Sequence, residues 1–210
     1  MNIINLFPGS WCSNCYLISS GTHAAVIDPS NSAKAILDKV KENSLTLDFI
    51  ILTHGHFDHI ISLDTLRDAA GVPAYIHKDD AELLSSGDKN AFKTFFGKDK
   101  TYSPADILLS DRDILMLGNE KLEIISTPGH TKGSICIKCS DKMITGDTLF
   151  ADGFGRCDLY GGNSIQLRRS LEILREIEKI NTQNGIKITI YPGHGSSALL
   201  KNALDNVLYL

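Results

Sequence analysis

The sequence has no excess of positive charge and no long apolar segment. It contains 21 Lys and Arg residues against 25 Asp and Glu, a formal net charge of −4, so no overall positive field attracts a polyanion. No apolar run approaches the ~20 residues that a membrane-spanning helix needs. The first basic residue is Lys34, so the basic start of a secretory signal is missing. We predict a cytoplasmic protein whose partner is neither nucleic acid nor a membrane.

Cysteine is also sparse. Five cysteines are an odd number, which does not suit a disulfide framework, so we expect reduced thiols. The pairs Cys12/Cys15 and Cys136/Cys139 have zinc-ribbon spacing, but they lie in or beside expected strands, where positions three apart face opposite sides. We therefore expect them to pack within strands, and we expect Cys12 in an exposed loop beside Trp11.

What is present is typical of a globular protein. The 210 residues are 42% hydrophobic and 22% charged, which fits one domain over residues 1–210. The first half predicts strands at 3–7, 15–18, 24–27, 47–52 and 74–77. It predicts helices beginning after Ser32, at 60–70 and at 80–86. Residues 87–106 give no clear assignment.

The second half repeats this order. Strands are predicted at 114–117, 122–126, 135–139, 143–145 and 187–190, and a closing helix at 198–208. Asn163 and Gln166 form a capping-box pattern ahead of a helix whose apolar stripe includes Leu167 and Leu174. Two similar halves of strands and helices predict a layered α/β sandwich.

Five of the seven histidines follow segments that are predicted strands, and two aspartates share this position. Glycine beside each segment lets the backbone turn sharply. Imidazoles and carboxylates are ligands for zinc, iron and manganese, and a tetrahedral ion seldom takes more than four protein ligands. Seven candidates therefore predict two ions, held by His54, His56, Asp58, His59, His130, Asp147 and His194.

The segment 53–59 resembles the T-H-x-H-x-D-H signature of the metallo-β-lactamase superfamily, and His130, Asp147 and His194 follow in the expected order. The resemblance covers nearly the whole chain. Within that superfamily, residues 146–150 and 155–159 are similar to hydroxyacylglutathione hydrolases (glyoxalase II), to their short bacterial relatives, and to persulfide dioxygenases.

This resemblance implies a four-layer αββα sandwich, with two mixed sheets and helices on the outer faces. It assigns His54, His56 and His130 to a first metal and Asp58, His59 and His194 to a second, with Asp147 bridging. Zinc is the first choice, and iron or manganese are alternatives. The implied reaction is attack by a bridging hydroxide on a small thioester, with Asp58 and Asp147 as catalytic residues and Asp58 guiding the leaving proton.

The substrate is expected to be a small, anionic thioester of the hydroxyacyl type. Arg156 is the candidate for an anionic group, with an ion pair to Asp158 as the alternative, and Tyr160 is a second candidate from its position. Trp11 and Phe154 could line the pocket mouth. Glyoxalase II enzymes carry a C-terminal extension with basic residues for glutathione, whereas Lys201 is the one cation after His194, so the thiol stays open.

Three other functions stay open. A persulfide dioxygenase would hold one iron on His54, His130 and Asp147. A lactone hydrolase would also use the bridging aspartate. A binding module with structural metals is the non-catalytic alternative, although structural zinc sites usually contain cysteine. A β-lactamase proper fits less well, because we expect a cysteine there in place of Asp147.

Overall fold

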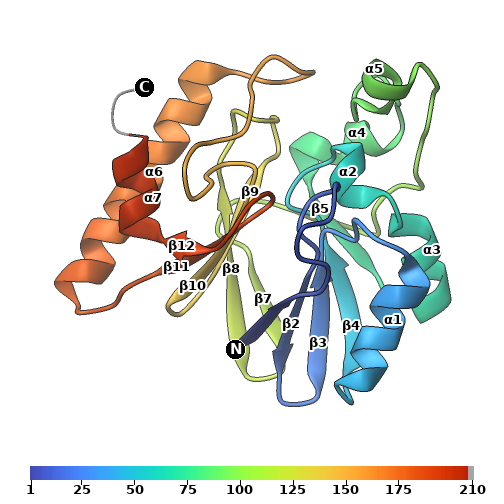
Figure 1. The fold of residues 1–210 in the computed structure, drawn as a ribbon, viewed down its shortest axis with the longest axis horizontal. Coiled ribbons are helices and arrows are strands. Elements are labelled where there is room, and N and C mark those ends of the chain that lie inside the picture. Colours follow the sequence, from blue (N-terminus) through green and yellow to red (C-terminus); the bar gives the residue numbers. More distant parts are fainter. Residues whose placement is uncertain (208–210) are drawn as a thin grey trace.

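The computed structural model describes residues 1–207. Two six-stranded sheets face each other at the centre, and helices cover both outer faces (Figure 1). This is the predicted αββα arrangement. The first sheet has the order β1 (Asn2–Asn5), β2 (Tyr16–Ser20), β3 (His23–Ile27), β4 (Thr46–Ile51), β5 (Ala74–His77) and β6 (Ile107–Leu109).

The second sheet has the order β12 (Ala198–Leu199), β11 (Thr189–Pro192), β10 (Lys142–Gly146), β9 (Ile135–Cys139), β8 (Glu120–Ser126) and β7 (Ile114–Leu117). Both sheets are mixed: β3 to β6 pair in parallel in the first sheet, and β10 pairs in parallel with β11 in the second.

The helices divide between the two faces (Figure 1). Helices α1 (Ala33–Glu42) and α3 (Leu63–Ala70) cover the first sheet. Helices α6 (Ser164–Gln183) and α7 (Leu200–Asn206) cover the second. The short helices α2 (Phe57–Ile60), η1 (Lys78–Asp80), α4 (Ala81–Leu84) and α5 (Phe92–Phe96) lie near one end of the first sheet.

The core has three apolar layers, and alternation along the strands builds them. Leu17 and Ile50 face the α1/α3 layer, whereas their neighbours Ile18 and Ile51 face the second sheet. A third cluster lies between the second sheet and the helices α6 and α7. Strands buried on both faces have nearly continuous apolar sequences, which is why the layered fold was predictable.

The local predictions hold in part. The predicted helix at 60–70 is two helices, α2 and α3, because Ser62 leaves the helical path to donate its N–H to the Pro29 carbonyl, at 3.0 Å. The unassigned segment contains α5, and β6 was not predicted. The closing segment begins as β12 before α7, and Leu208 of that prediction lies outside the described residues.

The two predicted helix caps differ. Ser32 stands at the N-terminus of α1 but makes no side-chain capping bond. Asn163 caps α6 by accepting bonds from Ile165 and Gln166 N–H, both at 3.0 Å. The Asn163 N–H donates to the Gly129 carbonyl at 2.8 Å, so the reciprocal half of a capping box is replaced by a bond that fixes α6 to the segment before His130.

The cysteine predictions are confirmed in part: Cys136 and Cys139 pack within β9, whereas Cys12 and Cys15 lie in the segment between β1 and β2. All five cysteines are free thiols. Cys136 and Cys139 lie on opposite faces of β9, in different core clusters. Cys12, expected to be exposed, is buried at 5% exposure, and burial together with the charge of Asp58 raises its pKa to about 11. Among residues 1–207, no helix is both long and apolar enough to span a membrane.

Candidate metal centre

All seven predicted ligands meet at one edge of the sandwich, beyond the carboxyl ends of β4, β8, β10 and β11. Three overlapping groups of ligand atoms each lie within 4.8 Å of one another. The first sheet supplies residues 54–59, and the second supplies His130, Asp147 and His194. The three groups are His54, His56 and His130; His54, His59 and Asp147; and Asp58, His59 and His194.

Asp147 lies between the two predicted ligand sets. Its Oδ1 is 3.3 Å from His59 Nε2, and its Oδ2 is 3.5 Å from His130 Nε2 and 3.6 Å from His194 Nε2. Asp58 Oδ2 is 3.2 Å from His194 Nε2. Asp147 would therefore be within reach of cations held by either predicted set.

Hydrogen bonds at Nδ1 fix the orientation of the His59 and His130 rings. His130 Nδ1 lies 2.7 Å from the Arg156 carbonyl oxygen, which can only accept, so Nδ1 donates and Nε2 has a lone pair. His59 Nδ1 likewise donates to Asp28 Oδ2 at 2.8 Å. Both Nε2 atoms are therefore directed at the cluster as ligand atoms.

The same argument orients His54 through Thr53. The Thr53 hydroxyl has one proton and donates it to Asp28 Oδ2 at 2.7 Å, so it accepts from His54 Nδ1 at 3.1 Å. His54 Nε2 then faces His130 Nε2 at 3.2 Å, two lone pairs without a proton between them.

Buried ligand atoms that lack a hydrogen-bond partner fit divalent cations. Within the described chain, His56 Nε2, His59 Nε2 and Asp147 Oδ1 are buried without a hydrogen-bond partner. Buried acceptors without partners are costly. A cation between the ligand atoms would compensate the Nε2 of His59 and the Oδ1 of Asp147, and a donor set of imidazole and carboxylate suits zinc, iron or manganese.

Burial and neighbouring charges shift the pKa values of the predicted ligands. Burial, together with the adjacent His130, lowers the pKa of His56 to about 3, so its imidazole is neutral. Burial also lowers the pKa of His54. Burial would raise the pKa of Asp147, but the charge of His59 outweighs it and holds that pKa well below its usual range. His54, His56 and Asp147 are therefore deprotonated at neutral pH. Burial would lower the pKa of His59, but the charge of Asp147 outweighs it and holds that pKa well above its usual range, so a cation at His59 has to displace a proton.

Two buried carboxylates that the sequence reasoning missed hold the ligand segments. Asp28 accepts from Thr53 and His59, as above, and also from Thr53 N–H at 2.7 Å. Asp80 accepts from Gly55 N–H at 3.0 Å, from Gly133 N–H at 2.6 Å and from the Thr131 hydroxyl at 2.7 Å. Asp80 thus ties the segment of His54 and His56 to the segment of His130.

A cavity of about 400 Å³ opens onto the cluster, the size of a small-molecule site. Arg156 lines it, and its guanidinium binds both oxygens of Asp158, at 2.6 and 2.7 Å. The ion pair that the sequence offered as the alternative is therefore formed. Trp11 lines the cavity as expected, whereas Phe154 lines a different one.

Tyr160 is not among the residues that line this cavity. Its hydroxyl donates to Glu82 Oε1 at 2.9 Å, and the ammonium groups of Lys89 and Lys132 lie 5.1 and 5.3 Å from its ring centre. These contacts join the segment after Arg156 to α4, and the substrate contact of Tyr160 stays a prediction.

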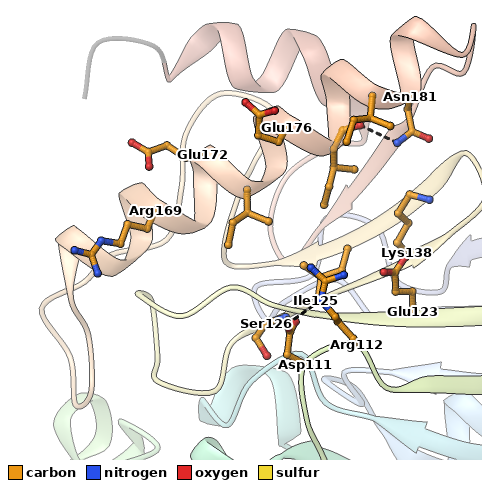
Figure 2. Close-up of a pocket in the computed structure, with 13 residues that line it drawn as sticks. Asp111, Arg112, Glu123, Ile125, Ser126, Lys138, Arg169, Glu172, Glu176 and Asn181 are labelled. Carbon is orange, nitrogen blue, oxygen red and sulfur yellow. Dashed lines mark hydrogen bonds and ion pairs between the residues drawn. The ribbon is translucent and has the colours of Figure 1, made fainter.

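A larger hollow of about 900 Å³ lies between α6 and the second sheet, away from the cluster. Figure 2 shows its lining: charged side chains of both signs around isoleucines, with no histidine or cysteine. It contains carboxylates but no imidazole, and it is a groove in the packing of α6 on the second sheet. Its labelled residues are Asp111, Arg112, Glu123, Ile125, Ser126, Lys138, Arg169, Glu172, Glu176 and Asn181.

Comparison with known proteins agrees with this site. A protein of Methanocaldococcus jannaschii named as a probable metallo-hydrolase is 38% identical over 196 residues, which cover 92% of each chain. An uncharacterized protein of Mycobacterium leprae is 36% identical over 213 residues, 94% of each chain.

Solved structures share the fold. The B3 metallo-β-lactamase BLEG-1 has a TM-score of 0.83 at 30% identity, covering 97% of this chain and 96% of that one. TTHA1623, solved in a di-iron-bound form, has a TM-score of 0.79 at 26% identity, covering 96% of each chain. The sequence model of the metallo-β-lactamase superfamily matches residues 11–197. The chain belongs to the metallo-β-lactamase superfamily.

Proposed function

We propose that this protein hydrolyses small thioesters of the hydroxyacyl type, as glyoxalase II does, with two divalent cations at the cluster. Zinc is the proposed metal, and the similar TTHA1623, which was solved with two irons, supports iron as the alternative. The proposed substrate carries an anionic group that faces Arg156. The five free thiols support a reducing compartment, and we place the protein in the cytoplasm.

One observation carries this proposal: seven His and Asp side chains bring their ligand atoms together beside a cavity, and among the described residues His59 Nε2 and Asp147 Oδ1 are buried there without a hydrogen-bond partner. Structural zinc sites are usually closed by four ligands in which cysteine is prominent. This site contains only imidazoles and carboxylates and opens to a cavity, which is typical of a catalytic site.

When bound, the cations supply Lewis acidity and activate water as the nucleophile. The chain's own residues then have separate tasks. Asp28, Thr53 and the Arg156 carbonyl orient the imidazoles. Asp58 lines the cavity beside the cluster, where it can carry a proton to the leaving thiolate. Water adds to the acyl carbon, the C–S bond breaks, and a carboxylate and a thiol leave.

No cysteine is placed to act as the nucleophile among the described residues. Burial raises the pKa of Cys12 to about 11 and that of Cys136 to about 12, so neither is a thiolate at neutral pH. Cys157 lines a different cavity. A mechanism without a covalent acyl-enzyme is consistent with this arrangement.

The test combines metal analysis with turnover. Protein purified without chelators should contain close to two equivalents of metal per chain and should hydrolyse hydroxyacyl thioesters. Asp147→Ala should lose both metal and activity, because Asp147 contacts ligands of both sets. Full turnover by an Asp147→Ala protein that retains two ions would contradict the proposal.

The open alternatives are outcomes of the same experiment. One equivalent of iron with oxygen consumption on a persulfide would indicate the dioxygenase. Turnover of lactones but not of thioesters would indicate a lactone hydrolase. Fully metallated protein inactive on all three classes would indicate a binding module.

A further inference from the structure

We propose that aromatic side chains on one side of the cavity bind an apolar substituent of the acyl group, so the preferred substrates are thioesters of 2-hydroxy acids with an aryl side chain. This inference rests on the proposed function. The aromatic wall is defined as the five aromatic side chains that line the cavity with the metal ligands: Trp11, Phe57, Phe95, Phe96 and Phe150.

The wall presents apolar surface to solvent beside the cluster. Trp11 is 72% exposed, Phe95 53% and Phe96 47%. Single exposed aromatic residues are ordinary, but a group of them lining the same cavity as catalytic ligands marks a ligand surface. Because these residues share the cavity with His56 and Asp147, a group resting on them belongs to a molecule that also reaches the cluster.

One residue of the aromatic wall, Phe57, belongs to the metal-ligand motif. Phe57 stands between His56 and Asp58, is 7% exposed, and contacts Phe95 and Phe96 with ring centres 5.5 and 5.4 Å away. These contacts fix α5 against the segment 54–59, which carries four predicted ligands. A surface that is already in place loses little freedom on binding.

The segment before α5 is held in an unusual conformation. Ala91 has a φ of +66°, in the left-handed region that disfavours residues other than glycine. Buried Asn90 supports it, since the Asn90 amide donates to the Lys100 carbonyl at 2.9 Å and its side-chain oxygen accepts from Phe92 N–H at 3.0 Å. Phe57 N–H donates to the Asn90 carbonyl at 3.0 Å. Several bonds thus maintain the position of α5 over the cavity.

Charged side chains form a smaller part of the cavity's binding surface than the aromatic wall does. Among the described residues that line this cavity, Arg156 is the one Lys or Arg, and both oxygens of Asp158 already bind it. An anionic group on the substrate would share Arg156 with Asp158. The aromatic wall is therefore the part of the cavity that best discriminates between acyl groups.

The first test compares S-lactoyl and S-mandeloyl thioesters of N-acetylcysteamine, which differ in a methyl against a phenyl group. The metal-loaded protein should favour the mandeloyl ester about tenfold or more in kcat/KM, the gain expected for burying an aryl group. In the Phe95→Ala/Phe96→Ala variant, this ratio should fall toward one. Met116→Ala removes a 52% exposed side chain of β7 and should leave the ratio unchanged.

A second readout does not depend on turnover. Trp11 is the one tryptophan of the chain, so its fluorescence reports on the wall directly. Titrating metal-free protein with the corresponding thioethers, in which a methylene replaces the carbonyl, should change Trp11 emission. The aryl thioether should saturate at about tenfold lower concentration than the methyl thioether, and this difference should be lost in the double variant.

The outcomes separate the two proposals. Equal kcat/KM for the two esters, with equal thioether binding, would overturn the aromatic wall and leave thioester hydrolysis standing. No turnover of either ester by fully metallated protein would overturn the proposed function, whereas the thioether titration would still decide whether the wall binds aryl groups.

Discussion

Asp28 offers the sharpest test of how the fold holds the metal ligands. Its buried carboxylate accepts three hydrogen bonds: from Thr53 N–H and the Thr53 hydroxyl, both at 2.7 Å, and from His59 Nδ1 at 2.8 Å. In Asp28→Asn, an amide NH₂ replaces one of the two oxygens. At least one of these donors then faces another donor, and the negative charge beside His59 is removed.

Asp28→Asn should lower both the thermal stability of the protein and its affinity for metal. Leaving buried donors unpaired costs about 3 kcal/mol here, which lowers Tm by about 10 °C in a chain of this length. When the NH₂ takes the Oδ2 position, His59 Nδ1 loses its acceptor, and the imidazole is no longer held with Nε2 directed at the cluster. Metal affinity should therefore fall about 10- to 100-fold.

The assay is thermal unfolding of metal-free protein, together with competition against a chelator of known affinity. Asp48→Asn is the matched control, because Asp48 Oδ2 also lies 2.8 Å from a histidine nitrogen, Nδ1 of His23, but at the surface. Surface pairs of this kind contribute little. If Asp28→Asn matched Asp48→Asn in Tm and in metal affinity, the positioning role of Asp28 would be refuted.

Two further perturbations test the packing of the site and its pH response. Gly193→Ala should abolish metal binding, because a Cβ there would overlap Asp147 Oδ1 and lie 2.7 Å from His59 Cε1; Gly153→Ala, with open space around it, is the control, and equal metal content would contradict the packing argument. Burial raises the pKa of Asp80 from 3.8 to about 6 despite its bond from Thr131, so folding takes up a proton between these values. The stability from protonated Asp80 is complete below pH 3.8 and is lost as pH rises through 6. Urea unfolding of metal-free protein should show this loss in wild type but not in Asp80→Asn, and parallel pH profiles would disprove it.

The sequence predicted the parts of the fold that have a local pattern. Strands β2 to β4 contain continuous, buried apolar runs at residues 16–18, 24–27 and 49–51. Strand β6 has three residues, of which Ile107 is 40% and Leu108 54% exposed and only Leu109 is buried. Such a short edge strand has no alternation to detect, and its existence depends on pairing with β5.

The same distinction applies to the site. The ligands stand in a dense motif, so their convergence was predictable. Asp28 and Asp80 each accept hydrogen bonds from residues 25 or more positions away. No motif in the sequence next to either aspartate predicts these bonds. Asp28 could have been predicted from its position directly after the buried strand β3. The parallel neighbour of β3 is β4, which leads into the ligand motif. Tyr160 was chosen by position alone, and its contacts lie elsewhere.

The cluster also joins the two sheets. The first sheet supplies four of the seven ligands and the second supplies three, so any cation held by both sets connects the two halves. Protein bonds already cross at this edge: Ile135 N–H donates to the Thr53 carbonyl at 2.9 Å, and the Tyr16 hydroxyl to the Pro192 carbonyl at 2.7 Å. Because these bonds position both halves before metal arrives, the site is preorganised, and less of the binding free energy of the cations is spent on ordering the chain.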